Sequence, residues 1–326
     1  MRAPEFWTGK DGASRLTATA LSPLGRLYGA VTAWKRTHAA PYCAKAKIAC
    51  IGNLTVGGSG KTPVSLAVLD ILQSRNVSAA ALTRGYGGRI RKPTVVDSSL
   101  HTAADVGDEA LLLAARNRTI VSADRPLGAR LADAEGVAVI VMDDGYQNFS
   151  LAKDLQILVV DAEAGFGNGH ILPAGPLRER IEDGLARADA VVFVGAGSPA
   201  LPGFSGPVFR ARLIPARGED LASRRVLAFA GIGRPEKFFD TLRALGASVV
   251  ATYPFPDHHV FRTDEIAKLR SNAVSENAML ITTEKDYVRL APAERGDIQV
   301  LAVRAALEQP QAFEQFVMTR LNCLPK

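Results

Sequence analysis

Residues 55–62 read TVGGSGKT and stand between a short apolar run at 48–51 and a stretch with helical spacing of apolar residues that begins near Pro63. Glycines between a strand and a helix let backbone N–H groups turn toward phosphate oxygens. The lysine of such a loop reaches the outer phosphates, the following hydroxyl ligates Mg²⁺, and the helix dipole favours the negative charge. A threonine replaces the first glycine of the usual pattern, but the context still predicts a nucleotide-phosphate site formed by Thr55, Val56, Gly57, Gly58, Ser59, Gly60, Lys61 and Thr62.

Strand-like and helix-like segments alternate along the chain after this loop. The continuous apolar runs at 137–142, 155–160 and 190–194 are typical of parallel strands that are covered on both faces. The sequence therefore predicts a P-loop-type three-layer α/β/α domain with a parallel sheet. A smaller α/β domain is expected to follow it.

The composition changes between residues 195 and 207, where four glycines and three prolines occur. Such a stretch is the best candidate for a domain boundary. We therefore expect the nucleotide-binding domain over 48–205 and the smaller domain over 206–326. A strand at 299–303 and a final helix from residue 310 belong to the smaller domain in this prediction.

The basic character of the chain is confined to its beginning. Eight basic and two acidic residues precede Ile48, and this difference accounts for the whole net charge of +6. The chain therefore offers no broad basic surface for nucleic acid, and none is expected as a partner. Its three cysteines show no metal-ligand spacing, which favours reduced thiols.

Apolar and aromatic residues alternate with the charges in this arm, residues 1–47, which is expected to be part of the first domain. Leu24, Leu27, Tyr28 and Val31 have the spacing of one helical face. Flanked by basic residues, such a face favours an anionic membrane surface, although docking on the protein's own core is the alternative. Pro23 and the residues after it are expected to interrupt the only candidate for a transmembrane helix, and a cleaved signal peptide fits poorly.

Two aspartates, Asp143 and Asp144, follow the apolar strand predicted at 137–142. The carboxyl end of a parallel strand lies beside the phosphate loop, and P-loop enzymes use an aspartate there to hold Mg²⁺. The sequence therefore predicts that this pair binds the metal, directly or through water. An Asp-Gly turn without a ligand is the simpler interpretation.

Acidic residues also open the next helix, at Asp108 and Glu109. They can simply complement the helix dipole. Alternatively, one lies near the acceptor hydroxyl and the other near Mg²⁺, because a phosphoryl acceptor must be positioned and must lose its proton. In the smaller domain, a predicted loop contains Asp257, His258 and His259. This group could be a metal site, although adjacent side chains rarely ligate one ion together, or it could be a solvated loop without a ligand. The later stretch 283–286 reads TEKD and lacks the spacing of a guanine-reading motif.

Seven motifs of this chain occur in an order that closely resembles the tetraacyldisaccharide 4'-kinase family, from about Phe6 to at least Asp286. They are GNLTVGGSGKT, LTRGYGG, DVGDEA, VIVMDDGYQN, FGNGHILPAGPLRE, FPDHH and TTEKD. The resemblance implies two α/β/α domains joined by a short β linker, with ATP in the cleft. It also implies transfer of the γ-phosphate of ATP, with Mg²⁺, to the 4'-hydroxyl of a lipid A precursor, tetraacyldisaccharide 1-phosphate, which yields lipid IVA.

The resemblance also assigns roles to individual residues. Asp108 and His258 would form a base dyad, and Lys61 would contact the phosphates. The arm would place the protein at the cytoplasmic face of the bacterial inner membrane as a peripheral or monotopic protein. The metal would be surrounded by Thr62, Glu109, Asp143 and Asp144, and substrate or phosphate contacts would come from Arg84, Tyr86, Arg125, Gln147, Asn168 and Arg178.

Two other classes of protein compete with a lipid sugar kinase. The first is a P-loop ATPase that acts as a conformational switch or metallochaperone, a class that often has lysine at the position of Val56. The second is a membrane adaptor with a vestigial nucleotide fold. Transfer of phosphate from ATP to the lipid precursor distinguishes the kinase from both.

Overall fold

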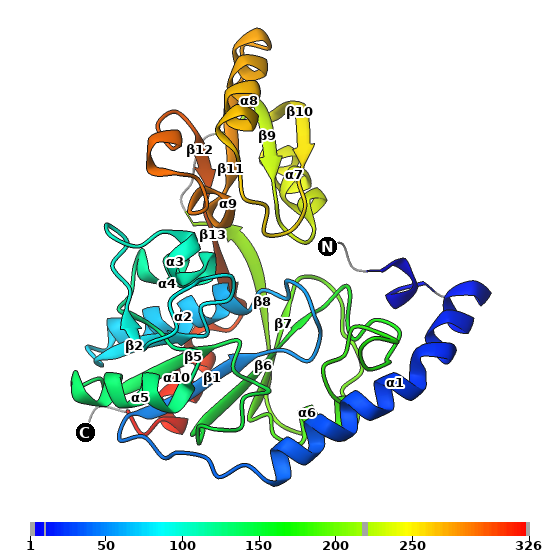
Figure 1. Ribbon diagram of the computed structural model, residues 1–326, viewed down its shortest axis with the longest axis vertical. Helices are drawn as coiled ribbons and strands as arrows, with labels where there is room; N and C mark the ends of the chain where they lie inside the picture. The colour runs from blue at the N-terminus through cyan, green and yellow to red at the C-terminus, as the bar shows by residue number, and fades with distance from the viewer. Residues whose placement is uncertain (1–3, 10, 217–220, 324–326) are drawn as a thin grey trace.

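The structure is a computed structural model and describes residues 4–9, 11–216 and 221–323. It consists of a larger α/β part, a smaller α/β part above it, and a long helix that runs along the larger part (Figure 1). This helix is α1 (Gly12–Thr37), which follows the single turn η1 (Glu5–Trp7).

The larger part is built on a nine-stranded sheet with the order β13-β8-β7-β6-β1-β5-β2-β4-β3. Its strands are parallel except for the outermost pairs, β13 with β8 and β3 with β4. The carboxyl end of β5 therefore lies directly beside that of β1, as the sequence predicted. The strands are β1 (Lys47–Gly52), β2 (Ala79–Thr83), β3 (Thr94–Val95), β4 (Thr119–Val121), β5 (Val139–Asp143), β6 (Leu155–Asp161), β7 (Ala190–Val194), β8 (Val208–Pro215) and β13 (Val303–Leu307).

Helices cover both faces of this sheet because successive strand residues point to opposite sides. On β1, Ala49 and Ile51 join the core beneath α2 and α10, whereas Ile48 and Cys50 join the clusters on the other face. The result is the three-layer α/β/α arrangement that the continuous apolar strands predicted. Its helices are α2 (Lys61–Ser74), α3 (Ala103–Val106), α4 (Asp108–Ala114), α5 (Arg125–Ala134), α6 (Ile181–Leu185) and α10 (Pro310–Arg320).

The smaller part has a parallel four-stranded sheet with the order β10-β9-β11-β12. Helix α7 packs in the hydrophobic cluster on one face and α8 in the cluster on the other. This part is also a three-layer unit. Its elements are β9 (Arg225–Ala230), α7 (Pro235–Ala244), β10 (Ser248–Pro254), α8 (Thr263–Ser275), β11 (Met279–Thr283), α9 (Glu284–Tyr287), η2 (Pro292–Glu294) and β12 (Gln299–Leu301).

The predicted division between residues 205 and 206 does not match the division of strands between the two sheets. Both β8 and β13 pair within the larger sheet, antiparallel to each other, and α10 packs beneath that sheet. The strand expected at 299–303 is two strands in different sheets, separated at Ala302. The smaller part is thus inserted between β8 and β13, and the glycine- and proline-rich stretch is only the loop before β8.

Helix α1 continues through Pro23, so the predicted interruption is wrong. Even so, no helix of the described residues is long and apolar enough to cross a membrane. The side of α1 that faces the protein carries small residues, Ala18 and Gly25, and a Cβ atom at Gly25 would lie 2.8 Å from the carbonyl oxygen of Ile171. The predicted apolar face is not docked on the core. Its side chains are 45–74% exposed: Leu16, Leu24, Leu27, Tyr28, Val31 and Trp34.

We predict that Phe313→Ala will lower the free energy of unfolding of the larger part by about 3–5 kcal/mol, as for other buried aromatic side chains. Phe313 is fully buried on α10 and packs edge-on against Phe209 of β8 at 5.0 Å between ring centres. Denaturant unfolding measures the loss. Val274→Ala, at an 81% exposed position, is the control and should change stability by less than about 0.5 kcal/mol. Similar losses for the two variants would place α10 outside the core.

Candidate active site

The phosphate loop connects the end of β1 to α2, which begins at Lys61, two residues before the predicted start. Gly57 and Gly60 have φ angles of 114° and 84°, a region that favours glycine. A hydrogen bond from Asn53 Nδ2 to Ser59 Oγ, 3.0 Å long, braces the loop from inside. This conformation places Lys61 at the N-terminus of α2, where its side chain is almost completely buried.

Asp143 lies at the end of β5, directly across from the loop. Its two carboxylate oxygens accept hydrogen bonds from Thr62 Oγ1 at 3.0 Å and Ser65 Oγ at 2.7 Å. Burial raises the pKa of Asp143 to about 6, and the negative charge of Glu109 adds to this effect. A buried carboxylate with hydroxyl partners and a second carboxylate nearby is a suitable environment for a cation.

Asp144, the next residue, faces two basic side chains. Its Oδ1 lies 2.9 Å from Arg178 Nη1 and 3.7 Å from Lys61 Nζ. Burial alone would raise the pKa of Asp144, but the charges of Lys61 and Arg178 outweigh it and hold the pKa below its usual value. Asp144 therefore links the phosphate-loop lysine to the arginine expected at the substrate.

Three of the four residues predicted around Mg²⁺ lie together and suit that ion, namely Thr62, Glu109 and Asp143, whereas Asp144 is paired with Lys61 and Arg178. No group of three or more His, Cys, Asp or Glu residues suited to a metal occurs within the described parts of the chain. Mg²⁺ does not need one, because it usually takes one or two carboxylates together with water and phosphate oxygens. Thr62 and Asp143 are hydrogen-bonded to each other, and Glu109 acts on Asp143 electrostatically.

The other half of the site begins at Asp108, the first residue of α4. The preceding Gly107 has φ 87° and ψ 152°, a conformation that is essentially restricted to glycine. A Cβ atom at Gly107 would lie 2.4 Å from the carbonyl oxygen of Tyr86. This turn directs the buried Asp108 carboxylate toward the smaller part, where His258 Nδ1 lies 3.0 Å from Asp108 Oδ2.

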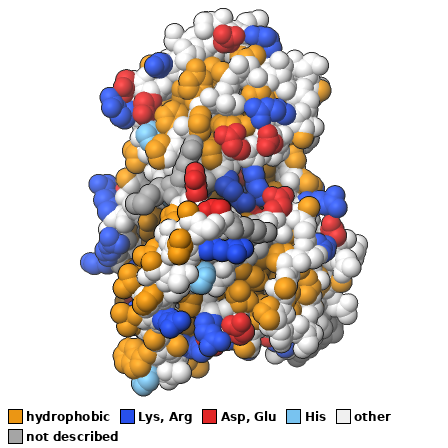
Figure 2. Space-filling model, turned by 90° about the vertical axis from the view of Figure 1, so that its right-hand side faces the viewer, with side chains coloured by type: hydrophobic (Ala, Val, Ile, Leu, Met, Phe, Trp, Pro, Cys, Tyr) orange, Lys and Arg blue, Asp and Glu red, His pale blue; other side chains and the backbone are white. Residues whose placement is uncertain are grey.

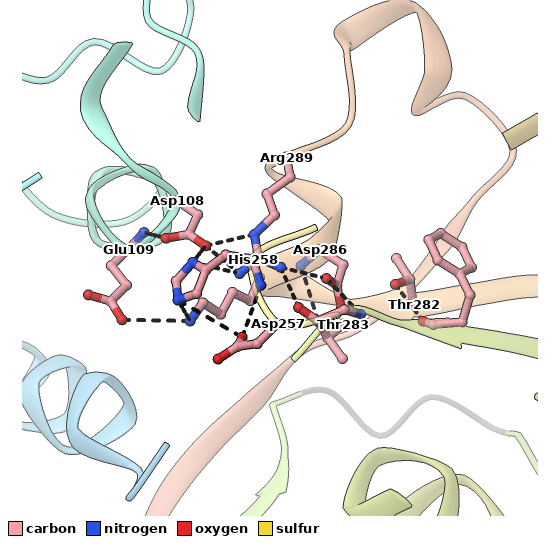
Figure 3. Close-up of polar contacts among 11 residues, drawn as sticks. Asp108, Glu109, Asp257, His258, Thr282, Thr283, Asp286 and Arg289 are labelled. Carbon is pink, nitrogen blue, oxygen red and sulfur yellow. Dashed lines mark hydrogen bonds and ion pairs between the residues drawn. The ribbon is translucent and has the colours of Figure 1, made fainter. Parts of the chain in front are cut away.

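Figure 3 shows that Arg289 converges on the same carboxylate. Arg289 Nε donates to Asp108 Oδ2 at 2.7 Å, and both side chains are only 5% exposed. Arg289 Nη1 also donates to Asp286 Oδ1 at 2.8 Å. Burial alone would raise the pKa of Asp108, but the hydrogen bond with His258 and the charges of Lys285 and Arg289 hold it well below its usual value. Asp108 is therefore ionised.

Sequence reasoning missed Arg289, Asp286 and Lys285. The TTEKD motif contributes to the family resemblance and lacks the spacing of a guanine-reading motif, but neither observation gives Lys285 or Asp286 a role, and Arg289 lies outside the motif. In the structure, α9 follows β11 and carries Lys285 and Asp286, and the turn after α9 carries Arg289 to the interface with α4. The spacing of Asp286 and Arg289 as an i,i+3 pair was visible in the sequence, but their distant partner was not.

Three of the remaining predicted residues, Tyr86, Gln147 and Arg125, lie at or near this site. Tyr86 is in edge contact with His258, with ring centres 5.6 Å apart, and Gln147 lies 3.4 Å from Arg178. Arg125 is only 3% exposed, and burial lowers its pKa to about 10. Its Nε atom lacks a hydrogen-bond partner within the described residues, which leaves one buried donor for an anion.

Asn168, Arg84 and His259 form no hydrogen bond or ion pair with Asp108 or Asp143 in the described part of the chain. Asn168 donates to the carbonyl oxygens of Phe6 and Ala174 and so ties the N-terminal turn to its neighbouring loop, without joining the cluster above. Arg84 is exposed. His259, next to the dyad histidine, points away from it and lies 2.8 Å from Glu265.

Comparison with known proteins identifies the family of this chain. The family model for the tetraacyldisaccharide-1-P 4'-kinase matches residues 17–322. The chain belongs to this family. It is 48% identical to a tetraacyldisaccharide 4'-kinase of Rhodospirillum centenum over 99% of this chain and 97% of that protein. A second such kinase, from Methylorubrum extorquens, is also 48% identical, over 97% of each chain.

A solved structure supports the fold of this family member. The crystal structure of Aquifex aeolicus LpxK in complex with ATP has a TM-score of 0.76 and 26% sequence identity, and the similarity covers 93% of this chain and 99% of that one. The predicted family and the predicted α/β fold with a parallel sheet are therefore confirmed.

We predict that Arg289→Met will lower the free energy of unfolding by about 3–5 kcal/mol, because it leaves the buried Asp108 carboxylate without its guanidinium partner. Chemical denaturation measures the change. The matched control is Arg225→Met, which removes an exposed pair with Glu276 and should cost no more than about 1 kcal/mol. Equal losses in the two variants would contradict a structural role for the buried pair.

Proposed function

We propose that this chain transfers the γ-phosphate of ATP to the 4'-hydroxyl of tetraacyldisaccharide 1-phosphate and forms lipid IVA. The observation that carries the proposal is the meeting of a phosphate loop and a carboxylate–imidazole pair at one cleft. Lys61 and Asp143 supply the nucleotide side, and Asp108 with His258 supplies the acceptor side. Figure 2 shows basic and acidic side chains gathered in the recess between the two parts.

On the nucleotide side, the phosphate loop and the start of α2 bind the phosphate chain of ATP. The loop N–H groups, the α2 dipole and the Lys61 ammonium group favour its negative charge. Mg²⁺ would be held by Thr62, Glu109 and the two aspartates, and when bound it neutralises charge on the phosphates. Arg125 and Arg178 supply further guanidinium groups near Asp144.

On the acceptor side, Asp108 orients the imidazole of His258. Because the Asp108 carboxylate is ionised, it fixes the proton of the ring on Nδ1, and Nε2 keeps its lone pair. Nε2 can then accept the proton of the 4'-hydroxyl while the hydroxyl oxygen attacks the γ-phosphorus. The bond from that phosphorus to the bridging oxygen breaks, and ADP leaves with the electron pair.

The experiment is to incubate the protein with labelled ATP and the lipid precursor in detergent, with Mg²⁺. Phosphate should appear on the 4' position of the lipid. A conformational ATPase or a membrane adaptor predicts no labelled lipid, and that result would reject the kinase.

We predict that Asp108→Asn will slow phosphoryl transfer about 10²–10⁴-fold, the usual range for losing acid–base assistance. The asparagine keeps the shape of the side chain but not its charge, so ATP should still bind. The rate of lipid phosphorylation and the affinity for a fluorescent ATP analogue are measured together. Asp264→Asn, an exposed position on α8, serves as the control. A normal rate in Asp108→Asn would remove this residue from the reaction.

We further propose that α1 holds the protein on the anionic cytoplasmic face of the inner membrane. Its exposed apolar face includes Leu27 and Trp34, while Arg15 and Arg26 stand beside that face. Grooves of about 330 and 410 Å³ lie between α1 and the loop around His170.

Replacing Leu24, Leu27 and Trp34 by serine should reduce recovery of the protein with anionic phospholipid vesicles, because the variant has less apolar surface to insert. Co-sedimentation measures the bound fraction. A control variant, Leu100→Ser, changes a 76% exposed leucine elsewhere and should bind as the unchanged protein does. Unchanged sedimentation of the triple variant would show that α1 does not dock on the membrane.

A further inference from the structure

Lys285 extends from the smaller part across the cleft to the larger part. It is the second residue of α9, directly after β11, and its side chain is 24% exposed. Its Nζ atom lies 3.4 Å from His258 Nε2 and 3.7 Å from Glu109 Oε1. These two partners belong to different halves of the proposed site, so the ammonium group lies between the base and the metal ligands.

The contacts of Lys285 are long for a buried structural ion pair. Ordinary N–H···O hydrogen bonds span about 2.7–3.2 Å, and both of its contacts exceed that range. An ammonium group has three donors, and its compact charge can move by rotation of a flexible stem. The group is therefore held in position without being bound strongly to either neighbour.

The backbone that carries Lys285 is rigid by comparison. Thr283 caps α9 by accepting the N–H of Asp286, and the fully buried Asp286 accepts the N–H of Gly231 at 3.0 Å. Arg289, in the turn after this helix, donates to both Asp286 and Asp108 and so connects the helix to Asp108. Figure 3 shows Arg289 and His258 between Asp108 on the side of α4 and Asp286 with Thr283 on the opposite side. The geometry thus fixes where Lys285 can reach.

We propose that Lys285 is a further catalytic residue, one that contacts the transferring phosphoryl group from the acceptor side. This role rests on the proposed kinase function. The 4'-hydroxyl must approach His258 Nε2 to give up its proton, and the γ-phosphate must approach the metal ligands around Glu109. The ammonium group already lies between these two positions and is displaced from Nε2 toward the phosphoryl oxygens when the hydroxyl arrives.

The balance of the step leaves Lys285 chemically unchanged. The hydroxyl proton moves to His258 Nε2, the new O–P bond forms, and the bond to the ADP oxygen breaks with its electron pair going to ADP. Lys285 keeps all its protons. Its charge faces the oxygens of the group in transfer, where negative charge must be stabilised and where a pre-positioned cation is most effective.

The test uses Lys285→Cys in the full-length chain, followed by alkylation with 2-bromoethylamine. Alkylation restores an ammonium group on a side chain of nearly the original length. We expect Lys285→Cys to lower kcat for lipid phosphorylation about 10²–10³-fold, the loss seen when one pre-positioned charge donor is removed. Because the contact is made during transfer, the affinity for ATP should change little. Alkylation should return most of the lost rate.

Two controls separate the lysine from the reagent. Lys268→Cys, at an exposed position of α8, should be as active as the unchanged protein before and after treatment. The unchanged protein is treated in parallel because Cys43 is exposed. Lys285→Arg keeps the charge and should retain more activity than Lys285→Met. These two variants test the need for a positive charge if the cysteine variant does not fold.

The outcomes distinguish this inference from the proposed function. If the unchanged protein transfers no phosphate to the lipid, the kinase function itself fails. If the unchanged protein is active and the folded Lys285 variants are equally active, Lys285 is not catalytic. A slow, folded Lys285→Cys variant that alkylation does not restore, or an Arg variant no better than the Met variant, also overturns the proposal.

Discussion

The ion pair between Asp108 and Arg289 is the interaction on which the arrangement of the site depends. It joins α4 of the larger part to the turn that follows α9 in the smaller part, and both side chains are almost completely excluded from solvent. A buried charge without a partner is costly, so separation of the two parts is opposed unless water can solvate both groups. The same pair keeps Asp108 ionised and thereby fixes the orientation of His258. One contact therefore couples the position of a domain to the state of the proposed base.

The phosphate loop answers a different physical requirement, the binding of a polyanion together with a cation. Its glycines expose backbone N–H groups. Basic side chains near the loop suit the polyanion, and acidic side chains there suit the cation. Asp143 carries a raised pKa beside hydroxyl groups, whereas Asp144 is held ionised by two basic residues. The pKa values of these adjacent carboxylates thus shift in opposite directions, because burial dominates at Asp143 whereas two basic neighbours outweigh burial at Asp144.

Local patterns in the sequence predicted the parts of this site that are local in space. The TVGGSGKT loop, the aspartates after β5 and the alternation of strands and helices each depend on neighbouring residues, and the structure has them where they were expected. The domain boundary and the role of β13 were not predictable in this way, because the pairing of β13 with β8 is a contact across the whole inserted part. Lys285 and Arg289 were missed for the same reason. Their roles depend on contacts with Glu109 and Asp108 of α4, and the spacing of residues near them in the sequence does not reveal these contacts.

The pairing of β8 with β13 also has a mechanical consequence. Both connections to the smaller part leave the same edge of the large sheet as one antiparallel ribbon, instead of as two separate linkers. A two-stranded ribbon bends easily across its plane, but sliding one strand past the other would break its ladder of hydrogen bonds. We therefore expect the smaller part to rock about this edge as a hinged flap and to resist twisting or translation. Such a restriction would return Lys285 and Arg289 to the same positions relative to α4 each time the smaller part closes.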